Sequence, residues 1–163
     1  MRVGGAVFGL VVACSDGEPP VSPHPCASDE TSLEVAPPDG EYGDLARGGA
    51  FAAGIPPQGG APYSPLRLRV TGPGELFDGI DVDIAVFEDG ALLTETQLPM
   101  RLTCANVGDN AGRWVGAEVH LRYFGLELEE LDGRDVTVEV TVTAQTAPDL
   151  VLTDAGDVTL VVD

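Results

Sequence analysis

An alternation of apolar and polar residues with a period of two dominates the chain from about residue 42 onward. In the clearest example, 136–143, four valines alternate with polar residues. Because successive side chains of a β-strand point to opposite faces, this period predicts strands with one buried face. The pattern recurs, with turn residues between the segments, in 66–71, 80–86, 91–96, 98–104, 115–123, 150–153 and 158–162.

Strands of this number and spacing predict an all-β fold, a single antiparallel β-sandwich formed by residues 42–163. We expect 66–71 to pair with 80–87 as a hairpin and 150–153 to pair with 158–162 around a turn at 154–157. Pro99 is expected to interrupt its strand or to lie at an edge, because proline cannot donate to a ladder. The segment 128–143 resembles the late strands of immunoglobulin-like or fibronectin-type modules of bacterial surface proteins, which implies an immunoglobulin-like sandwich.

The amino terminus has the composition of an export signal. Arg2 is followed by a short apolar run that ends at Ala13, and this run is too short to span a bilayer. The next residues, Val11-Val12-Ala13-Cys14, resemble a bacterial lipobox. The resemblance implies that residues 1–13 are removed, that Cys14 carries the lipid, and that the protein is anchored at the outer membrane or cell surface, since Ser15 is not the aspartate that retains such proteins at the inner membrane.

The segment 14–41 is rich in Pro, Ser, Asp, Glu and Gly, a composition that favours disorder. We therefore predict a flexible tether over 14–41, within which 32–35 can form a short edge strand. The chain has three cysteines, an odd number that lipidation of Cys14 would resolve. Cys26 and Cys104 would then be free to form a disulfide in an oxidising compartment, or to remain unpaired.

The net charge of −19, with no lysine in the chain, argues against nucleic acid as a partner and excludes Schiff-base chemistry. A hydrolytic triad needs a histidine beside a nucleophile. The two histidines are His24, in the expected tether, and His120, on the polar face of a strand. We therefore expect no enzymatic activity.

Two weaker candidate sites remain. Asp78, Asp81 and Asp83 offer oxygen ligands for Ca²⁺, although Arg67 and Arg69 would neutralise the last two if the expected hairpin forms. Trp114 is the best candidate aromatic for carbohydrate binding, and the alternative is a place in the core. The sequence thus favours a noncatalytic, lipid-anchored interaction module with an unidentified protein or glycan partner. The alternative is a Ca²⁺-dependent or carbohydrate-binding adhesion domain.

Overall fold

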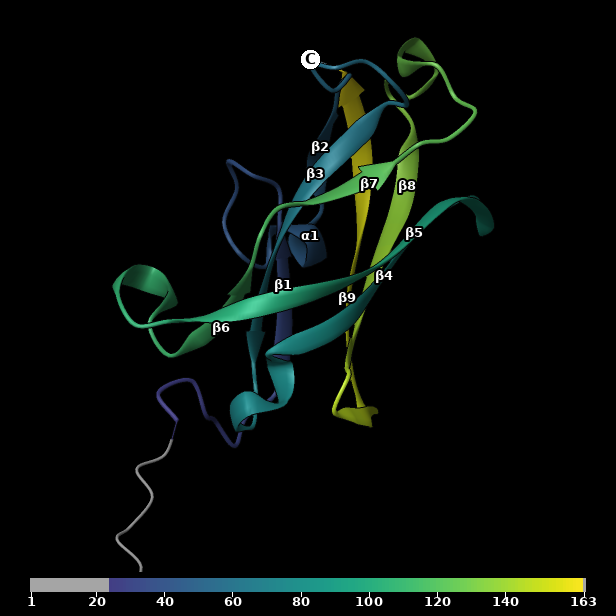
Figure 1. The fold of residues 1–163 in the computed structure, drawn as a ribbon. Helices are drawn as coiled ribbons and strands as arrows, with labels where there is room; N and C mark the ends of the chain where they lie inside the picture. Colours follow the sequence, from purple (N-terminus) through teal and green to yellow (C-terminus); the bar gives the residue numbers. More distant parts are fainter. Residues whose placement is uncertain (1–23, 163) are drawn as a thin grey trace, which may run out of the picture.

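A computed structural model describes residues 24–162, and it confirms that the fold is all-β (Figure 1). One short helix, α1 (Asp44–Arg47), and three 3₁₀ turns, η1 (Gly74–Phe77), η2 (Gly108–Asn110) and η3 (Leu128–Glu130), accompany the strands. Among the described residues, no helix is long and apolar enough to cross a membrane. The strands are β1 (Ser32–Ala36), β2 (Gly49–Ala53), β3 (Tyr63–Thr71), β4 (Gly79–Glu88), β5 (Ala91–Ala105), β6 (Arg113–Gly116), β7 (Val119–Arg122), β8 (Asp135–Ala144) and β9 (Ala147–Val162).

These strands form one sheet in the order β1-β3-β6-β5-β4-β8-β9-β2, and β7 pairs with the first half of β3. Strand β5 connects the two halves of the sheet, because residues 91–101 pair with β4 and residues 102–105 pair with β6. All pairs are antiparallel except β2 and β9, which are parallel. The sheet curls until its ends approach each other. A bridge between Gly54 and Tyr63 joins the end of β2 to β3, and α1 packs against β1 and β9.

The curl encloses one apolar core. Valine, leucine and isoleucine side chains from alternate positions of β3, β4 and β8 are buried there, as the period-two pattern predicts. Phe77, Leu131 and Tyr123 fill the core from the connections and strand ends. The inward-facing residues of the three strands are Leu66, Leu68, Val70, Ile80, Val82, Ile84, Val86, Val136, Val138, Val140 and Val142.

The expected hairpin of 66–71 with 80–87 is wrong. Strand β3 pairs with β1, β6 and β7, whereas β4 pairs with β5 and β8. Arg69 consequently lies opposite Glu34 of β1 and not opposite Asp81 or Asp83. The period of two identified the buried faces correctly, but it contains no information about which strands are neighbours.

Two expected breaks are also absent. Strand β5 runs through Pro99, which faces Asp81 of β4. The expected edge position of Pro99 is nevertheless confirmed, because the ladder with β6 begins only at Leu102 and the missing N–H is not needed on that side. Strand β9 runs through 154–157, where a turn was expected. By contrast, the predicted strand 115–123 is divided into β6 and β7.

The predicted tether is wrong for residues 24–41, which belong to the folded domain: β1 pairs with β3, and the side chains of Cys26 and Val35 are fully buried. The short edge strand expected at 32–35 is confirmed, because β1 lies at one end of the strand order. The segment 24–41 has few apolar residues, which is why its composition indicated disorder, but the pairing of β1 with β3 and the disulfide of Cys26 keep it in the fold. The expected signal segment 1–13 and residues 14–23, including Cys14, lie outside the described residues.

Candidate functional site

The N-terminal end of the described chain is fastened by a disulfide between Cys26 and Cys104 of β5. Their Cα atoms are 5.8 Å apart, and the bond closes a loop of 78 residues. Cys26 is buried below the start of β1, and its sulfur lies 3.3 Å from the carbonyl oxygen of Arg113. The structure therefore confirms the pairing that the cysteine count left open. Such a bond is typical of proteins in oxidising compartments, outside the cytosol.

Trp114 of β6 lies beside this disulfide and is covered by His24. The two rings are stacked, with centroids 5.1 Å apart and an interplanar angle of 7°. The Nδ1 atom of His24 accepts a hydrogen bond from the backbone N–H of Cys26, which fixes the orientation of the imidazole. Trp114 is only 4% exposed and its buried indole N–H has no hydrogen-bond partner among the described residues. The hypothesis of an exposed tryptophan for sugar binding is therefore wrong, because strand pairing with β3 and β5 turns this ring inward.

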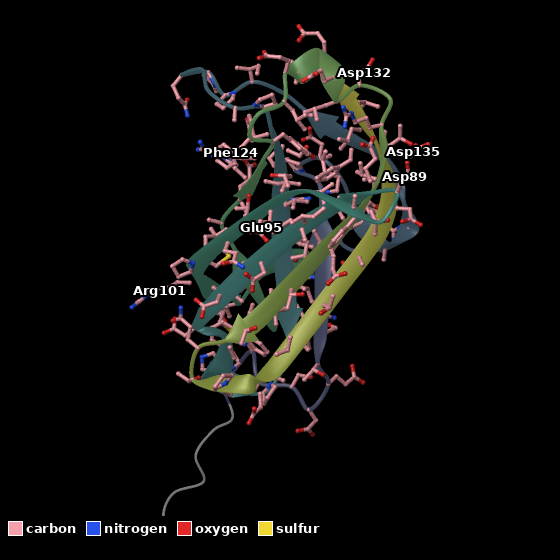
Figure 2. All side chains as sticks on the ribbon, turned by 90° about the vertical axis from the view of Figure 1, so that its right-hand side faces the viewer. Asp89, Glu95, Arg101, Phe124, Asp132 and Asp135 are labelled. Carbon is pink, nitrogen blue, oxygen red and sulfur yellow. A yellow bond between two sulfur atoms is a disulfide. The ribbon has the colours of Figure 1, made fainter. Side chains whose placement is uncertain are left out.

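An open depression of about 1000 Å³ adjoins this stack. Its wall contains Asp78, Arg101 and Gln145 together with the edges of His24 and Trp114. Arg101 and Asp78 are exposed, and Figure 2 shows the Arg101 side chain projecting away from the sheet. The arrangement offers a carboxylate, a guanidinium and an amide to a polar ligand.

The structure does not bring the three candidate calcium ligands together. Asp78 lines the large depression, whereas Asp81 and Asp83 line a separate and smaller one beside Pro99. Asp81 accepts a hydrogen bond of 2.9 Å from the amide of Gln145. Within residues 24–162, no group of three or more His, Cys, Asp or Glu side chains is arranged to hold a metal ion.

His120 lies on the exposed face of β7. Its Nε2 atom is 2.9 Å from a carboxylate oxygen of Glu118, and its ring packs at 4.6 Å from the ring of Tyr63. Both contacts are on the surface of the sheet, which matches the sequence-based interpretation of His120 as a solvated residue. Neither contact places the imidazole beside a serine, threonine or cysteine nucleophile.

Sequence reasoning did not single out Phe124, which follows β7 and is 64% exposed. It borders a depression of about 500 Å³ between β5 and β7, where Thr94 and Thr96 bridge to the backbone of Arg122. Figure 2 shows Phe124 in the upper half of the domain, away from Arg101. The alternation of buried Val119, Leu121 and Tyr123 places the next residue, Phe124, on the opposite, exposed side, and this was the signal that the sequence offered.

The sequence matches no family model and no curated protein.

Proposed function

We propose that the protein is a noncatalytic, lipid-anchored interaction module of the bacterial cell envelope. The observation that supports this proposal is the use of the cysteines. The chain has three cysteines, and Cys26 pairs with Cys104. Cys14 is left over, and it is the residue to which the lipobox-like sequence assigns the lipid.

The position of the disulfide supports a short connection to the membrane. Only the residues between Cys14 and His24 would separate the anchor from the folded domain, and a flexible chain of that length has a reach of roughly 20 Å. The described chain begins at the same end of the domain as the β8–β9 turn, opposite the end of β9 (Figure 1). In this proposal that end faces the membrane, and the end that bears the C-terminus and the 125–134 connection is presented to partners.

Two acyl chains or more are needed for stable anchoring, because one chain binds a bilayer only marginally. The net charge of −19 also supports an anchor that is lipid rather than electrostatic, since such a surface is repelled by anionic head groups. Within the proposal, the curled sheet is an immunoglobulin-like sandwich whose two layers share β5.

The test is expression of the full chain in a Gram-negative host, followed by intact-mass measurement and membrane fractionation. The wild type should start at Cys14, carry acyl mass and sediment with the outer membrane, and Cys14→Ala should be unlipidated and lose the membrane. Ser15→Ala is the matched control and should behave as wild type, whereas Ser15→Asp should move the protein to the inner membrane. A full-length, soluble, unmodified wild type would contradict the proposal.

A carbohydrate-binding adhesion domain is the second candidate function. The depression with Asp78, Arg101 and Gln145 favours a polar ligand such as a sugar. Thermal melting with a panel of monosaccharides tests it. A stabilising shift that is lost in Asp78→Asn, but kept in the control Asp83→Asn, would support this function, and no shift with any of these additives would contradict it.

A further inference from the structure

Arginine side chains gather on the outer face of β3 and its neighbours, in a chain whose overall charge is strongly negative. Arg67 and Arg69 project from β3 into a depression of about 380 Å³, which Tyr42, from the connection after β1, and Asn110 of η2 also line. Arg113 of β6 lies beside them. We call Tyr42, Arg67, Arg69 and Asn110 the arginine pocket.

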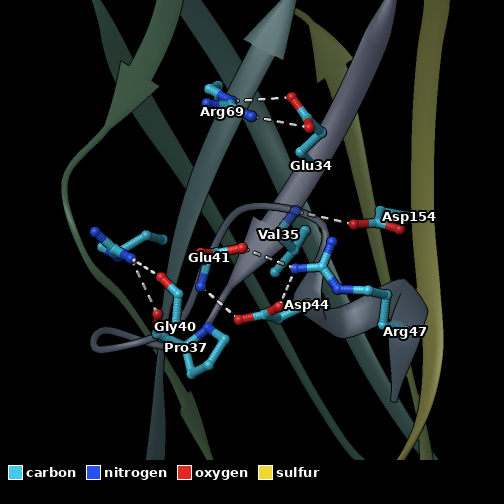
Figure 3. Close-up of polar contacts among 10 residues, drawn as sticks. Glu34, Val35, Pro37, Gly40, Glu41, Asp44, Arg47, Arg69 and Asp154 are labelled. Atoms are coloured by element: carbon cyan, nitrogen blue, oxygen red, sulfur yellow. Dashed lines mark hydrogen bonds and ion pairs between the residues drawn. The ribbon is translucent and has the colours of Figure 1, made fainter. Parts of the chain in front are cut away.

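One carboxylate serves two of these arginines. Glu34 of β1 accepts two hydrogen bonds of 2.9 Å from Nε and Nη2 of Arg69 (Figure 3). Its Oε2 atom also lies 3.3 Å from Nη1 of Arg113. The bidentate pair fixes the Arg69 guanidinium in place. The pKa of Glu34 is lowered, mainly by the hydrogen bonds from Arg69, so its carboxylate is charged at neutral pH.

Arg67 has no carboxylate partner within the described residues. Its Nη2 atom donates to the carbonyl oxygens of Gly40, at 2.6 Å, and Pro37, at 3.3 Å. Figure 3 shows these two carbonyls at the turn that precedes Glu41. The Nε atom of Arg67 is buried and has no hydrogen-bond partner among residues 24–162. Neutral carbonyls do not cancel its positive charge, and the carboxylate of Glu34 pairs with Arg69 and Arg113 but not with Arg67.

Tyr42 and Asn110 are positioned by the same arginines. The Tyr42 ring lies 4.3 Å from the guanidinium carbon of Arg69 and 5.2 Å from that of Arg67, which are distances of cation–π contacts. The Oδ1 atom of Asn110 accepts a hydrogen bond of 3.3 Å from Nη1 of Arg69. This bond leaves the Asn110 amide nitrogen, a donor of two hydrogen bonds, turned away from Arg69.

We infer that the arginine pocket binds a small ligand through a single carboxylate, held by the guanidinium of Arg67 and the amide of Asn110. The Nη2 atom of Arg67 is committed to Gly40 and Pro37 and its Nε atom is buried, so Nη1 is the group that donates to the ligand. Such a charge-assisted bond is about twice as strong as a neutral one. The ligand has to be small and singly charged. Glu41, whose side chain is 91% exposed, and the exposed Asp109 also line the pocket, and together with the net charge they repel polyanions.

Two kinds of molecule supply such a group: a uronate sugar and the free C-terminus of a peptide. The inference goes beyond the proposed function, because it holds whether or not Cys14 is lipidated. It is tested on the full chain carrying Cys14→Ala, by NMR titration with sodium glucuronate and with N-acetyl-alanyl-alanine. Glucose and the C-terminal amide of the same dipeptide are the uncharged controls.

One of the two carboxylates should produce saturable shifts of the Asn110 side-chain amide, with a dissociation constant on the order of 1 mM, and its uncharged control should not. Arg67→Gln should weaken binding at least about tenfold. The control is Arg134→Gln, which removes another guanidinium that donates to a backbone carbonyl, and this variant should bind as wild type. Asn110→Ala, which leaves the Arg67 contacts to Pro37 and Gly40 intact, should weaken binding even if Arg67→Gln does not fold.

Whichever carboxylate binds identifies the source of the ligand. Absence of saturation with both probes would overturn the inference. Equal binding of the acid and its uncharged control, wild-type binding by Asn110→Ala, or tighter binding of a polyanion such as heparin would overturn it as well.

Discussion

Removal of the Cys26–Cys104 disulfide should destabilise the domain by about 4.5 kcal/mol. In the chain-entropy description, closing a loop of 78 residues lowers the entropy of the unfolded chain by about 15 cal/mol/K, which is about 4.5 kcal/mol at 25 °C. Domains of this size are typically stable by about 5–15 kcal/mol, so the bond accounts for roughly 30% or more of the total. The folded state also depends on this bond, because it joins the segment before β1 to β5, the strand that connects both halves of the sheet.

The assay is urea denaturation of the double variant Cys26→Ser/Cys104→Ser against the disulfide-bonded protein, both carrying Cys14→Ala to prevent exchange with a third thiol. Trp114, stacked on His24 beside the bond, provides a fluorescence signal for this end of the domain, and far-UV circular dichroism reports the whole sheet. The melting temperature should fall by roughly 15–20 °C. A loss of less than about 1 kcal/mol in the free energy of unfolding would refute the reasoning, since it would mean that the 78-residue loop is already restricted in the unfolded chain.

Three further variants test separate parts of the fold. Asp154 accepts a hydrogen bond of 2.9 Å from the N–H of Val35, and its burial raises its pKa, so the folded state penalises the charged form. Asp154→Asn should therefore stabilise the protein at pH 7, and this gain should disappear as the pH falls through the raised pKa. Asp154→Ala should instead destabilise the protein by about 1–3 kcal/mol, because the Val35 N–H loses its acceptor. Identical melting temperatures of the two variants at pH 7 would contradict this. The pKa of Glu34 is lowered, mainly by the Arg69 hydrogen bonds, so Glu34→Gln should destabilise the protein by about 1 kcal/mol at pH 7. In chemical denaturation this difference in stability should shrink as the pH falls below 4.5. A difference that does not change with pH would argue against the ion pair as its cause. Gly156→Ala places a methyl group against the backbone carbonyl of Leu45 in α1 and should destabilise the protein by about 1–3 kcal/mol, as measured by thermal melting. Gly54→Ala is the control, because nothing lies within 4 Å of its added methyl group. Equal stability of the two variants would contradict the packing of α1 on β9.

The sequence predicted what depends on a strand's own residues. The buried faces of β3, β4 and β8 follow directly from the alternation, whereas the number of cysteines left open whether Cys26 and Cys104 form a disulfide. The all-β class needed no more than this.

What the sequence did not predict depends on contacts between distant segments. Gly156 signalled a turn, but it is a strand residue at which the α1 backbone approaches β9 so closely that a side chain would collide with it. Pro99 signalled a break, but β5 has no backbone partner on its second side at that position. The arginine pocket was missed because Arg67 and Arg69 were assigned to the wrong neighbouring strand, and Tyr42 reaches them only through the turn that follows β1.

The parallel pairing of β2 with the end of β9 has a consequence for how the domain is made. Gly49 of β2 pairs with Val158 of β9, 109 residues later in the chain, so this edge of the sheet cannot form until β9 is available. Contacts of such high sequence separation slow folding, because the entropy of loop closure is lost before any native pairing compensates for it. If the chain is exported N-terminus first, as we propose, this delay would keep it unfolded and threadable during transit, and the sheet would be completed only on the far side of the membrane.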